Sequence, residues 1–235
     1  LNWTGKRTAT LVEVRTDEGV TGWGDGFWGG DLLRERRETV IGRSPFEAEG
    51  IYEAMRPPMV LQSRMGAPVC GGLDMALWDL QGKALGKPVR ELMGKVWRDR
   101  VQPYCTALYR KDWPDLERGL AEEAAGWKER GFRTVKMKVG FGPEIDRRIV
   151  GAVREAIGDE IGLAVDANCA YDAATAVALA RKLEAFDLAW WEEPVLADNL
   201  AGYRRLREAT GIPLAGGETW DADRLLREDV QGRVV

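Results

Sequence analysis

Two kinds of periodicity divide the chain near residue 100. In the first hundred residues, Thr8–Thr16 and Gly19–Gly24 carry the alternating pattern of β-strands, and Asp17-Glu18 between them predicts a hairpin turn. Apolar residues then recur at helical spacing through Gly71–Leu85, which predicts an amphipathic helix packed on a core. We therefore expect an α+β unit over residues 1–100.

From residue 101 to residue 235 the pattern changes to strands that alternate with helices. The expected strands are Val101–Tyr104, Thr134–Val139, Gly162–Asp166, Leu188–Glu192 and Pro213–Ala215. The expected helices are Asp115–Arg130, Pro143–Ile157, Ala173–Phe186 and Asn199–Ala209. Alternation of this kind with short turns predicts a parallel α/β sheet, which can be built as a doubly wound sheet or as a (β/α)8 barrel.

Charged residues at the ends of four successive strands favour the barrel. Lys138, Asp166, Glu192 and Glu218 follow one another at intervals of about 26 to 28 residues, close to the roughly 30 residues that one β/α unit of a barrel takes. In a barrel these strand ends converge on one mouth, whereas in an open sheet they lie in a row. We therefore expect a TIM-like barrel, to which residues 101–235 contribute about five strands.

The three carboxylates among these residues form a candidate metal site. Asp166, Glu192 and Glu218 would face one another across the mouth of the barrel, where three like charges repel and a cation is the natural partner. Hard oxygen ligands in this number suit Mg²⁺. The alternative is that each carboxylate only caps the helix after its strand, and the common phase of all three argues against it.

Two lysines on one strand are the candidate acid–base groups. Lys136 and Lys138 lie two residues apart, so both point to the same face of the strand. The apolar residues between and beside them would face the helices, which places the lysines inside the barrel rather than in solvent. We expect carboxylates to compensate the two ammonium groups, and burial with mutual repulsion to lower a lysine pKa toward the range of a general base.

Composition limits the classes of function further. The net charge of the chain is −4, which argues against nucleic acid or an anionic membrane as a main partner. Three widely spaced cysteines, and the absence of an apolar run or a leader segment in these residues, predict reduced thiols in a cytoplasmic protein. The chain has no histidine, which excludes a Ser-His-Asp triad, a histidine-ligated zinc and a histidine base within these residues.

Several segments together resemble the mandelate racemase family of the enolase superfamily. The barrel segments that carry the resemblance are TVKMKVG (134–140), VDAN (165–168), WWEEP (190–194) and GGETW (216–220). In the front part, GVTGWGDG resembles the hairpin of that family's capping domain, and GGLDMALWDLQGKALGKPVRELMG resembles the helix that leads into its barrel. The resemblance implies an incomplete α+β capping domain at residues 1–100 and barrel strands one to five at residues 101–235.

The resemblance also implies roles for individual residues. Asp166, Glu192 and Glu218 match the family's Mg²⁺ ligands, Lys138 matches its acid/base lysine with Lys136 as the companion that tunes it, and Asn168 matches a position that touches substrate. Glu193 would lie behind the ligand Glu192. The implied reaction is Mg²⁺-dependent removal of the proton alpha to a carboxylate, giving an enediolate, in an acid-sugar dehydratase or a racemase/epimerase. The implied partners are a small carboxylate substrate and further copies of the chain in a homo-oligomer.

The chain departs from the family pattern where it ends. Val235 follows the fifth strand, and the family's sixth to eighth strands supply the groups that act on the other face of the substrate. We therefore expect these 235 residues alone not to form an active monomer. Two alternatives stay open: an inactive barrel kept for assembly, and a barrel that uses Lys138 or Lys136 as a Schiff-base nucleophile.

Two pairs of adjacent aromatic residues are further candidates. Trp190 and Trp191 are expected to be core residues beside Glu192. Phe27 and Trp28, between glycines after the hairpin, belong either to a loop over the substrate or to an exposed turn.

Overall fold

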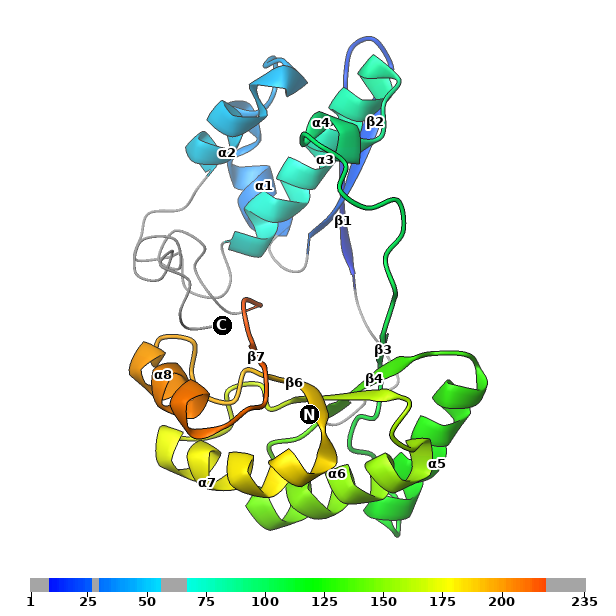
Figure 1. The fold of residues 1–235 in the computed structure, drawn as a ribbon. Helices are drawn as coiled ribbons and strands as arrows, with labels where there is room; N and C mark the ends of the chain where they lie inside the picture. Colours follow the sequence, from blue (N-terminus) through cyan, green and yellow to red (C-terminus); the bar gives the residue numbers. More distant parts are fainter. Residues whose placement is uncertain (1–8, 27–29, 56–66, 219–235) are drawn as a thin grey trace. The chain divides into compact units, whose positions relative to one another are not determined.

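The computed structural model describes residues 9–26, 30–55 and 67–218. The chain divides into two compact units, one from Lys6 to Val101 and the other formed mainly by Gln102–Val235 (Figure 1). Among the described residues, no helix combines the length and the apolar character that crossing a bilayer requires.

The first unit is built on a hairpin and one long helix. Strands β1 (Thr10–Arg15) and β2 (Thr21–Gly26) pair antiparallel, and helix α3 (Ala67–Leu85) packs on one face of the pair. A Cβ on Gly22 would lie 2.1 Å from the carbonyl oxygen of Ala76, so only glycine lets the helix backbone approach this closely. The hairpin and the helix predicted from the sequence are both confirmed.

Short helices complete the first unit. They are α1 (Gly30–Glu35), the 3₁₀ turns η1 (Arg37–Thr39) and η2 (Pro45–Glu47), α2 (Ala48–Met55) and α4 (Val89–Leu92). Ile51 and Met55 of α2 are buried in a small apolar cluster with Val12 of the hairpin and Leu73 of α3. The unit therefore has a core of its own.

The second unit is a parallel sheet with helices on one side. The strands are β3 (Cys105–Thr106), β4 (Thr134–Lys138), β5 (Gly162–Asp166), β6 (Leu188–Glu192) and β7 (Leu214–Ala215). The helices are α5 (Leu116–Glu129), α6 (Pro143–Ile157), α7 (Ala173–Leu183) with the 3₁₀ turn η4 (Glu184–Phe186), and α8 (Leu200–Ala209). All neighbouring strands are parallel, in the order β3-β4-β5-β6-β7.

This order decides between the two architectures that the sequence leaves open. In a doubly wound sheet the strand order reverses at a switch point and helices cover both faces. Here the order follows the sequence without reversal, and α5 to α8 lie on the same side of the sheet (Figure 1). The five strands therefore form a segment of barrel wall, with the helices outside.

One predicted strand is wrong. Val101–Tyr104 was expected to form the first barrel strand, but all four residues are exposed and the strand is Cys105–Thr106. Pro103 has no backbone N–H to donate to a neighbouring strand, which explains why pairing begins only after it. Cys105 pairs with Val135 of β4, so the sheet is continuous from that point.

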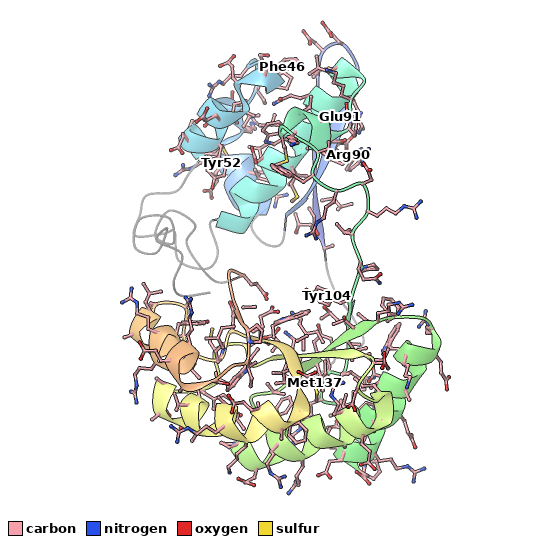
Figure 2. The ribbon with its side chains drawn as sticks, viewed as in Figure 1. Phe46, Tyr52, Arg90, Glu91, Tyr104 and Met137 are labelled. Atoms are coloured by element: carbon pink, nitrogen blue, oxygen red, sulfur yellow. The ribbon has the colours of Figure 1, made fainter. Side chains whose placement is uncertain are left out.

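The alternation along β4 places the lysines as expected. Val135, Met137 and Val139 are at most 4% exposed and belong to the apolar core of this unit. Figure 2 labels Met137 on the helix side of the sheet. Lys136 and Lys138 therefore point to the opposite face, which is the inside of the barrel wall.

Candidate metal centre

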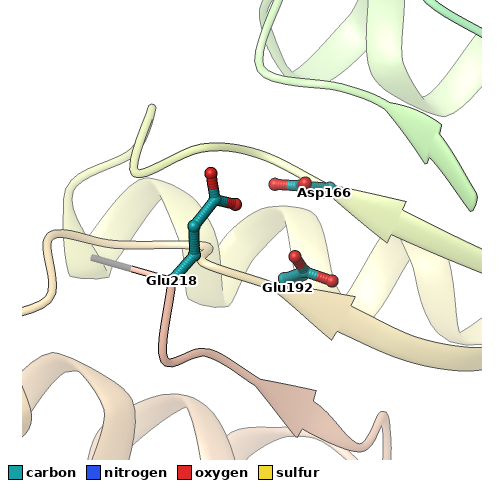
Figure 3. A group of neighbouring side chains, drawn as sticks. All are labelled: Asp166, Glu192 and Glu218. Carbon is teal, nitrogen blue, oxygen red and sulfur yellow. The ribbon is translucent and has the colours of Figure 1, made fainter. Parts of the chain in front are cut away.

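Three carboxylates meet at the carboxyl ends of neighbouring strands. Asp166 is the last residue of β5, Glu192 is the last residue of β6, and Glu218 follows β7. One carboxylate oxygen from each lies within 4.8 Å of the others, and Figure 3 shows the three side chains turned toward one another. Asp166 is fully buried, Glu192 is partly buried and Glu218 is exposed. The structure thus brings together the three residues that the strand spacing selects.

The geometry of this cluster fits a small divalent cation. Oxygens that surround Mg²⁺ at about 2.0–2.1 Å lie at most about 4.2 Å apart across the ion. The three carboxylate oxygens lie within 4.8 Å of one another, a bound slightly above that limit. All three are hard oxygen donors, which Mg²⁺ prefers. Exposure of Glu218 leaves one side of the cluster open to solvent or substrate. Asp166, Glu192 and Glu218 are therefore the residues that could hold a metal.

The two lysines contact the same carboxylates. Lys138 Nζ donates to Asp166 Oδ2 at 2.6 Å and to Asn168 Oδ1 at 2.8 Å. Lys136 Nζ donates to Glu192 Oε1 at 2.7 Å and lies 3.2 Å from Asp166 Oδ2. Both lysines are at most 7% exposed, so the carboxylates compensate charges that could not otherwise be buried.

The expected lowering of a lysine pKa is wrong for Lys136. Burial by itself lowers the pKa of its ammonium group, but the hydrogen bond to Glu192 and the charges of Asp166 and Glu192 outweigh burial. The pKa of Lys136 therefore lies above its usual value. The two carboxylates in direct contact with the ammonium group together have a larger effect on its pKa than burial, which the sequence alone indicates.

Asn168 is held beside Lys138 by a tight turn after β5. Its backbone is left-handed (φ 44°), a conformation that asparagine tolerates better than most residues. Its backbone N–H donates to Asp166 Oδ1 at 3.0 Å, while its side-chain oxygen accepts from Lys138. Both oxygens of Asp166 thus have protein partners, and the amide of Asn168 lies at the same mouth as the three carboxylates.

The adjacent tryptophans divide between the two faces of β6. Trp191 is fully buried in the core, as predicted, and its indole edge meets Tyr171 at a centroid distance of 6.4 Å. The prediction is wrong for Trp190, which is only partly buried and shares the face of Glu192. Its Nε1 donates to Glu192 Oε2 at 3.1 Å.

Glu193 directly follows Glu192 in the chain and contacts the thiol of Cys169. The residue is 1% exposed, has a left-handed backbone (φ 41°), and its Oε2 lies 3.7 Å from the thiol of Cys169. Cys105 is buried and Cys169 is partly buried. The backbone N–H of Glu193 also donates to the carbonyl of Ala215 on β7, so this residue joins two strands of the wall.

A hydrogen-bonded pair of Asp146 and Tyr171 beside the loop after the lysine strand was not predicted from the sequence. Asp146 in the first turns of α6 is fully buried and accepts from the N–H groups of Gly140 (2.8 Å) and Phe141 (3.1 Å). It also accepts from the hydroxyl of Tyr171, which in turn accepts from the N–H of Gly142 at 3.2 Å. These contacts fix the loop that directly follows Lys138.

Burial shapes the protonation of this pair. Loss of solvent raises the pKa of the Asp146 carboxyl, against the opposing effect of its three donors. Burial together with the hydrogen bond to Asp146 also raises the pKa of the Tyr171 hydroxyl above its usual value of 10. An aspartate four residues into a helix after G-F-G-P is the only local sign of this arrangement.

Some candidate residues lie outside the described part of the chain. Phe27 and Trp28, proposed for a loop over the substrate, belong to this group, as do Thr219 and Trp220 beside Glu218.

Comparison with known proteins agrees with the geometry. The N-terminal domain model of mandelate racemase / muconate lactonizing enzyme matches residues 2–94, and the enolase C-terminal domain-like model matches residues 119–231. D-galactarolactone cycloisomerase of Agrobacterium fabrum is 36% identical over 92% of this chain and 58% of its own length. D-galactonate dehydratase of Xanthomonas oryzae is 33% identical over 88% of this chain and 57% of its own length.

Solved structures give the same result. The 3,6-anhydro-D-galactonate cycloisomerase of Zobellia galactanivorans superposes with a TM-score of 0.79 at 37% identity, over 91% of this chain and 61% of that one. The chain therefore spans less than two thirds of the length of these relatives. With both domain models matched in order and the fold shared, the chain belongs to the mandelate racemase / muconate lactonizing enzyme family of the enolase superfamily.

Proposed function

We propose that the complete gene product is a Mg²⁺-dependent enzyme that removes the proton alpha to the carboxylate of an acid sugar or a related hydroxy acid. One observation carries the proposal: a buried lysine amine, Lys138, lies 2.6 Å from the innermost carboxylate of a three-carboxylate cluster that could hold a cation. A base and a site for an anion-stabilising metal therefore lie side by side at one strand mouth. Dehydration and racemisation or epimerisation both begin with this proton removal.

Each residue of the site has a role in the proposal. Asp166, Glu192 and Glu218 would hold Mg²⁺, and the bound ion would supply Lewis-acid stabilisation of the negative charge that develops on the substrate carboxylate. Lys138 exchanges a proton with the alpha carbon, which leaves an enediolate when the proton is removed. Asn168 holds the Lys138 amine in place through its side-chain oxygen and offers its amide N–H₂ to a substrate oxygen.

Lys136 is the companion of the base rather than the base itself. It donates to Glu192 and lies within ion-pair distance of Asp166, so it joins two of the three carboxylates. Its raised pKa keeps it an ammonium group at neutral pH. A permanent positive charge there holds the carboxylates together and leaves the proton transfer to Lys138.

The class of substrate is proposed from the relatives. The curated relatives named above are a cycloisomerase of a galactarolactone and a dehydratase of galactonate, and an arabinonate dehydratase of Saccharolobus solfataricus is 31% identical over 92% of this chain. Cycloisomerisation is a second candidate for the overall reaction, because relatives of 36% and 37% identity bear that name. Self-association into a homo-oligomer stays a prediction.

Proton exchange tests the first step without knowledge of the final product. The complete gene product is incubated in D₂O with a panel of aldonic and aldaric acids, and exchange at the alpha carbon is followed by proton NMR with and without EDTA. We expect exchange or conversion of at least one acid that requires Mg²⁺ and is lost in Lys138→Ala. Lys182→Ala is the matched control, because Lys182 is an exposed lysine on α7 that pairs with Glu144.

Two outcomes separate the alternatives. Exchange that survives in Lys138→Ala contradicts the assignment of the base. Turnover that resists EDTA and ends in a borohydride-trapped lysine adduct supports the Schiff-base barrel instead. A metal-loaded protein that exchanges no acid of the panel supports the inactive barrel kept for assembly.

A further inference from the structure

Trp190 contacts the carboxylate of Glu192 from inside the barrel wall. Its indole Nε1 donates to Glu192 Oε2 at 3.1 Å, while Lys136 Nζ donates to Glu192 Oε1 at 2.7 Å. The two donors approach different oxygens of the same group. The carboxylate of Glu192, whose side chain is 15% exposed, is therefore fixed in rotation before anything binds.

An aromatic contact holds the indole in turn. The ring of Tyr104, which precedes β3, meets the ring of Trp190 nearly edge to face, with a centroid distance of 5.0 Å and an interplanar angle of 76°. The ammonium group of Lys136 lies 6.0 Å from the centroid of the same Tyr104 ring. Tyr104 thus touches both groups that donate to Glu192, and aromatic pairs of this geometry are stabilising.

We infer that Trp190 is a positioning residue for the cation site: its indole N–H sets the orientation in which Glu192 offers an oxygen to the metal. The inference rests on the proposed function, because it takes Glu192 as a metal ligand. Each carboxylate oxygen has two lone pairs, so an oxygen that accepts from the indole keeps one lone pair for a cation. Hydrogen-bond partners that orient ligands in this way typically change metal affinity 10- to 100-fold when they are lost.

In the described part of the chain, no aromatic side chain donates to Asp166. Asp166 is oriented by Lys138 and by the backbone N–H of Asn168. Among the described contacts, Trp190 is the single neutral side chain that donates to a carboxylate of the cluster. Trp190 therefore offers a way to perturb one ligand without changing the charge of the site.

The test measures metal affinity in the complete gene product. Mn²⁺ serves as the probe because it shares the oxygen preference of Mg²⁺, and free Mn²⁺ is followed by electron paramagnetic resonance, with Mg²⁺ as competitor. Trp190→Phe keeps an aromatic ring but removes the N–H, and we expect the dissociation constant to rise by about tenfold or more. Trp127→Phe is the matched control, a partly buried tryptophan in the helix layer beside Phe132, and should bind as the wild type does.

Measurements in a second variant protein distinguish a positioning role of Trp190 from a nonspecific effect on the fold. If Trp190 acts through Glu192, Trp190→Phe should have no further effect on Mn²⁺ affinity in a Glu192→Gln protein. Tyr104→Leu leaves the N–H in place but frees the indole, and should weaken binding several-fold less than Trp190→Phe. This variant also serves if Trp190→Phe does not fold, because Tyr104 is 45% exposed and tolerates truncation.

The outcomes distinguish this inference from the proposed function. A wild-type protein that binds no Mn²⁺ refutes the metal site, and the inference with it. A wild type that binds Mn²⁺ beside a Trp190→Phe protein with a dissociation constant within twofold refutes the inference alone. An undiminished effect of Trp190→Phe in the Glu192→Gln background also overturns it, since the residue would then act through the fold.

Discussion

Replacing Tyr171 with phenylalanine removes one hydroxyl from the loops that follow β4 and β5. That hydroxyl donates to the fully buried carboxylate of Asp146 and accepts from the N–H of Gly142. The ring itself remains, so its edge contact with Trp191 is preserved. The change therefore isolates the hydrogen bonds that tie the end of the Lys138 strand to the neighbouring loop.

The expected magnitude follows from the two bonds. A hydrogen bond to a charged group contributes about 1.5–3 kcal/mol, and this applies to the bond between Tyr171 and Asp146. The N–H of Gly142 is only partly buried, so water can replace its lost acceptor at little cost. We expect Tyr171→Phe to lower the free energy of unfolding by about 1.5–3 kcal/mol.

The assay is urea denaturation of the complete gene product at several pH values. The pKa of Tyr171 in the folded protein lies above its usual value of 10. The contribution of the hydroxyl is therefore fully present below pH 10 and is lost as the pH rises through the folded pKa. The difference between wild type and Tyr171→Phe should be constant near neutral pH and should shrink above pH 10.

Asp146→Asn provides the internal control. An asparagine at this position has one acceptor oxygen where two are used, so its amide NH₂ would face either the N–H of Gly140 or the N–H of Phe141. Its cost should exceed that of Tyr171→Phe, and the two changes should not be additive, because they remove a shared bond. Equal stability of Tyr171→Phe and wild type, or strict additivity, would refute the account of this pair.

Three further changes test other parts of the wall. Arg154 donates to four backbone carbonyls between residues 158 and 187. Arg154→Met should therefore lower the free energy of unfolding, measured by urea denaturation, by at least about 3 kcal/mol. A decrease below about 1 kcal/mol, which is the contribution of one ordinary hydrogen bond, contradicts this role of Arg154. Gly140 has φ +95°, and a Cβ there would lie 2.8 Å from Ala170 Cβ, so a larger residue would strain the backbone. Gly140→Ala should therefore lower the melting temperature and slow proton exchange at the substrate. Unchanged values of both quantities contradict this prediction. Hydrogen bonds donated by Thr175 lower the pKa of Asp172 below 3.8. The stabilisation that Asp172→Ala removes should therefore be present above pH 3.8 and vanish as the pH falls through the folded pKa. A difference in stability between wild type and Asp172→Ala that persists in acid contradicts this prediction.

Periodicity predicts the elements of the barrel wall because their signals are local. β5, β6 and α6 have the bounds expected from the sequence, and Pro143 and Asp172 begin their helices as their residue types suggest. The first strand was misplaced because Val101 and Tyr104 are residue types common in strands, whereas Pro103 between them cannot donate to a neighbouring strand and pairing with β4 begins only at Cys105. Strand spacing also predicts that Asp166, Glu192 and Glu218 meet, since the number of residues between successive strand ends can be counted in the sequence.

The contacts around the site could not be predicted in the same way. Asp146 and Tyr171 lie 25 residues apart, and neither belongs to a pattern that singles out its partner. The direction of the Lys136 pKa depends on two carboxylates reaching its amine, which is a matter of side-chain geometry rather than of burial. Trp190 beside Trp191 reads as an apolar pair, and only its place on the face of Glu192 shows it as a donor.

The net charge at the mouth of the barrel wall agrees with the proposed chemistry. Before Lys138 gives up a proton to become the base, three carboxylates and two ammonium groups leave one net negative charge among Asp166, Glu192, Glu218, Lys136 and Lys138. A divalent cation would reverse that sign, and a single substrate carboxylate would then neutralise the site. Burial of unbalanced charge is costly, so in the proposed enzyme we expect a cation to bind first and an anionic substrate second. A monovalent cation in its place would leave no charge to attract the substrate, which is a physical reason for a divalent ion at this mouth.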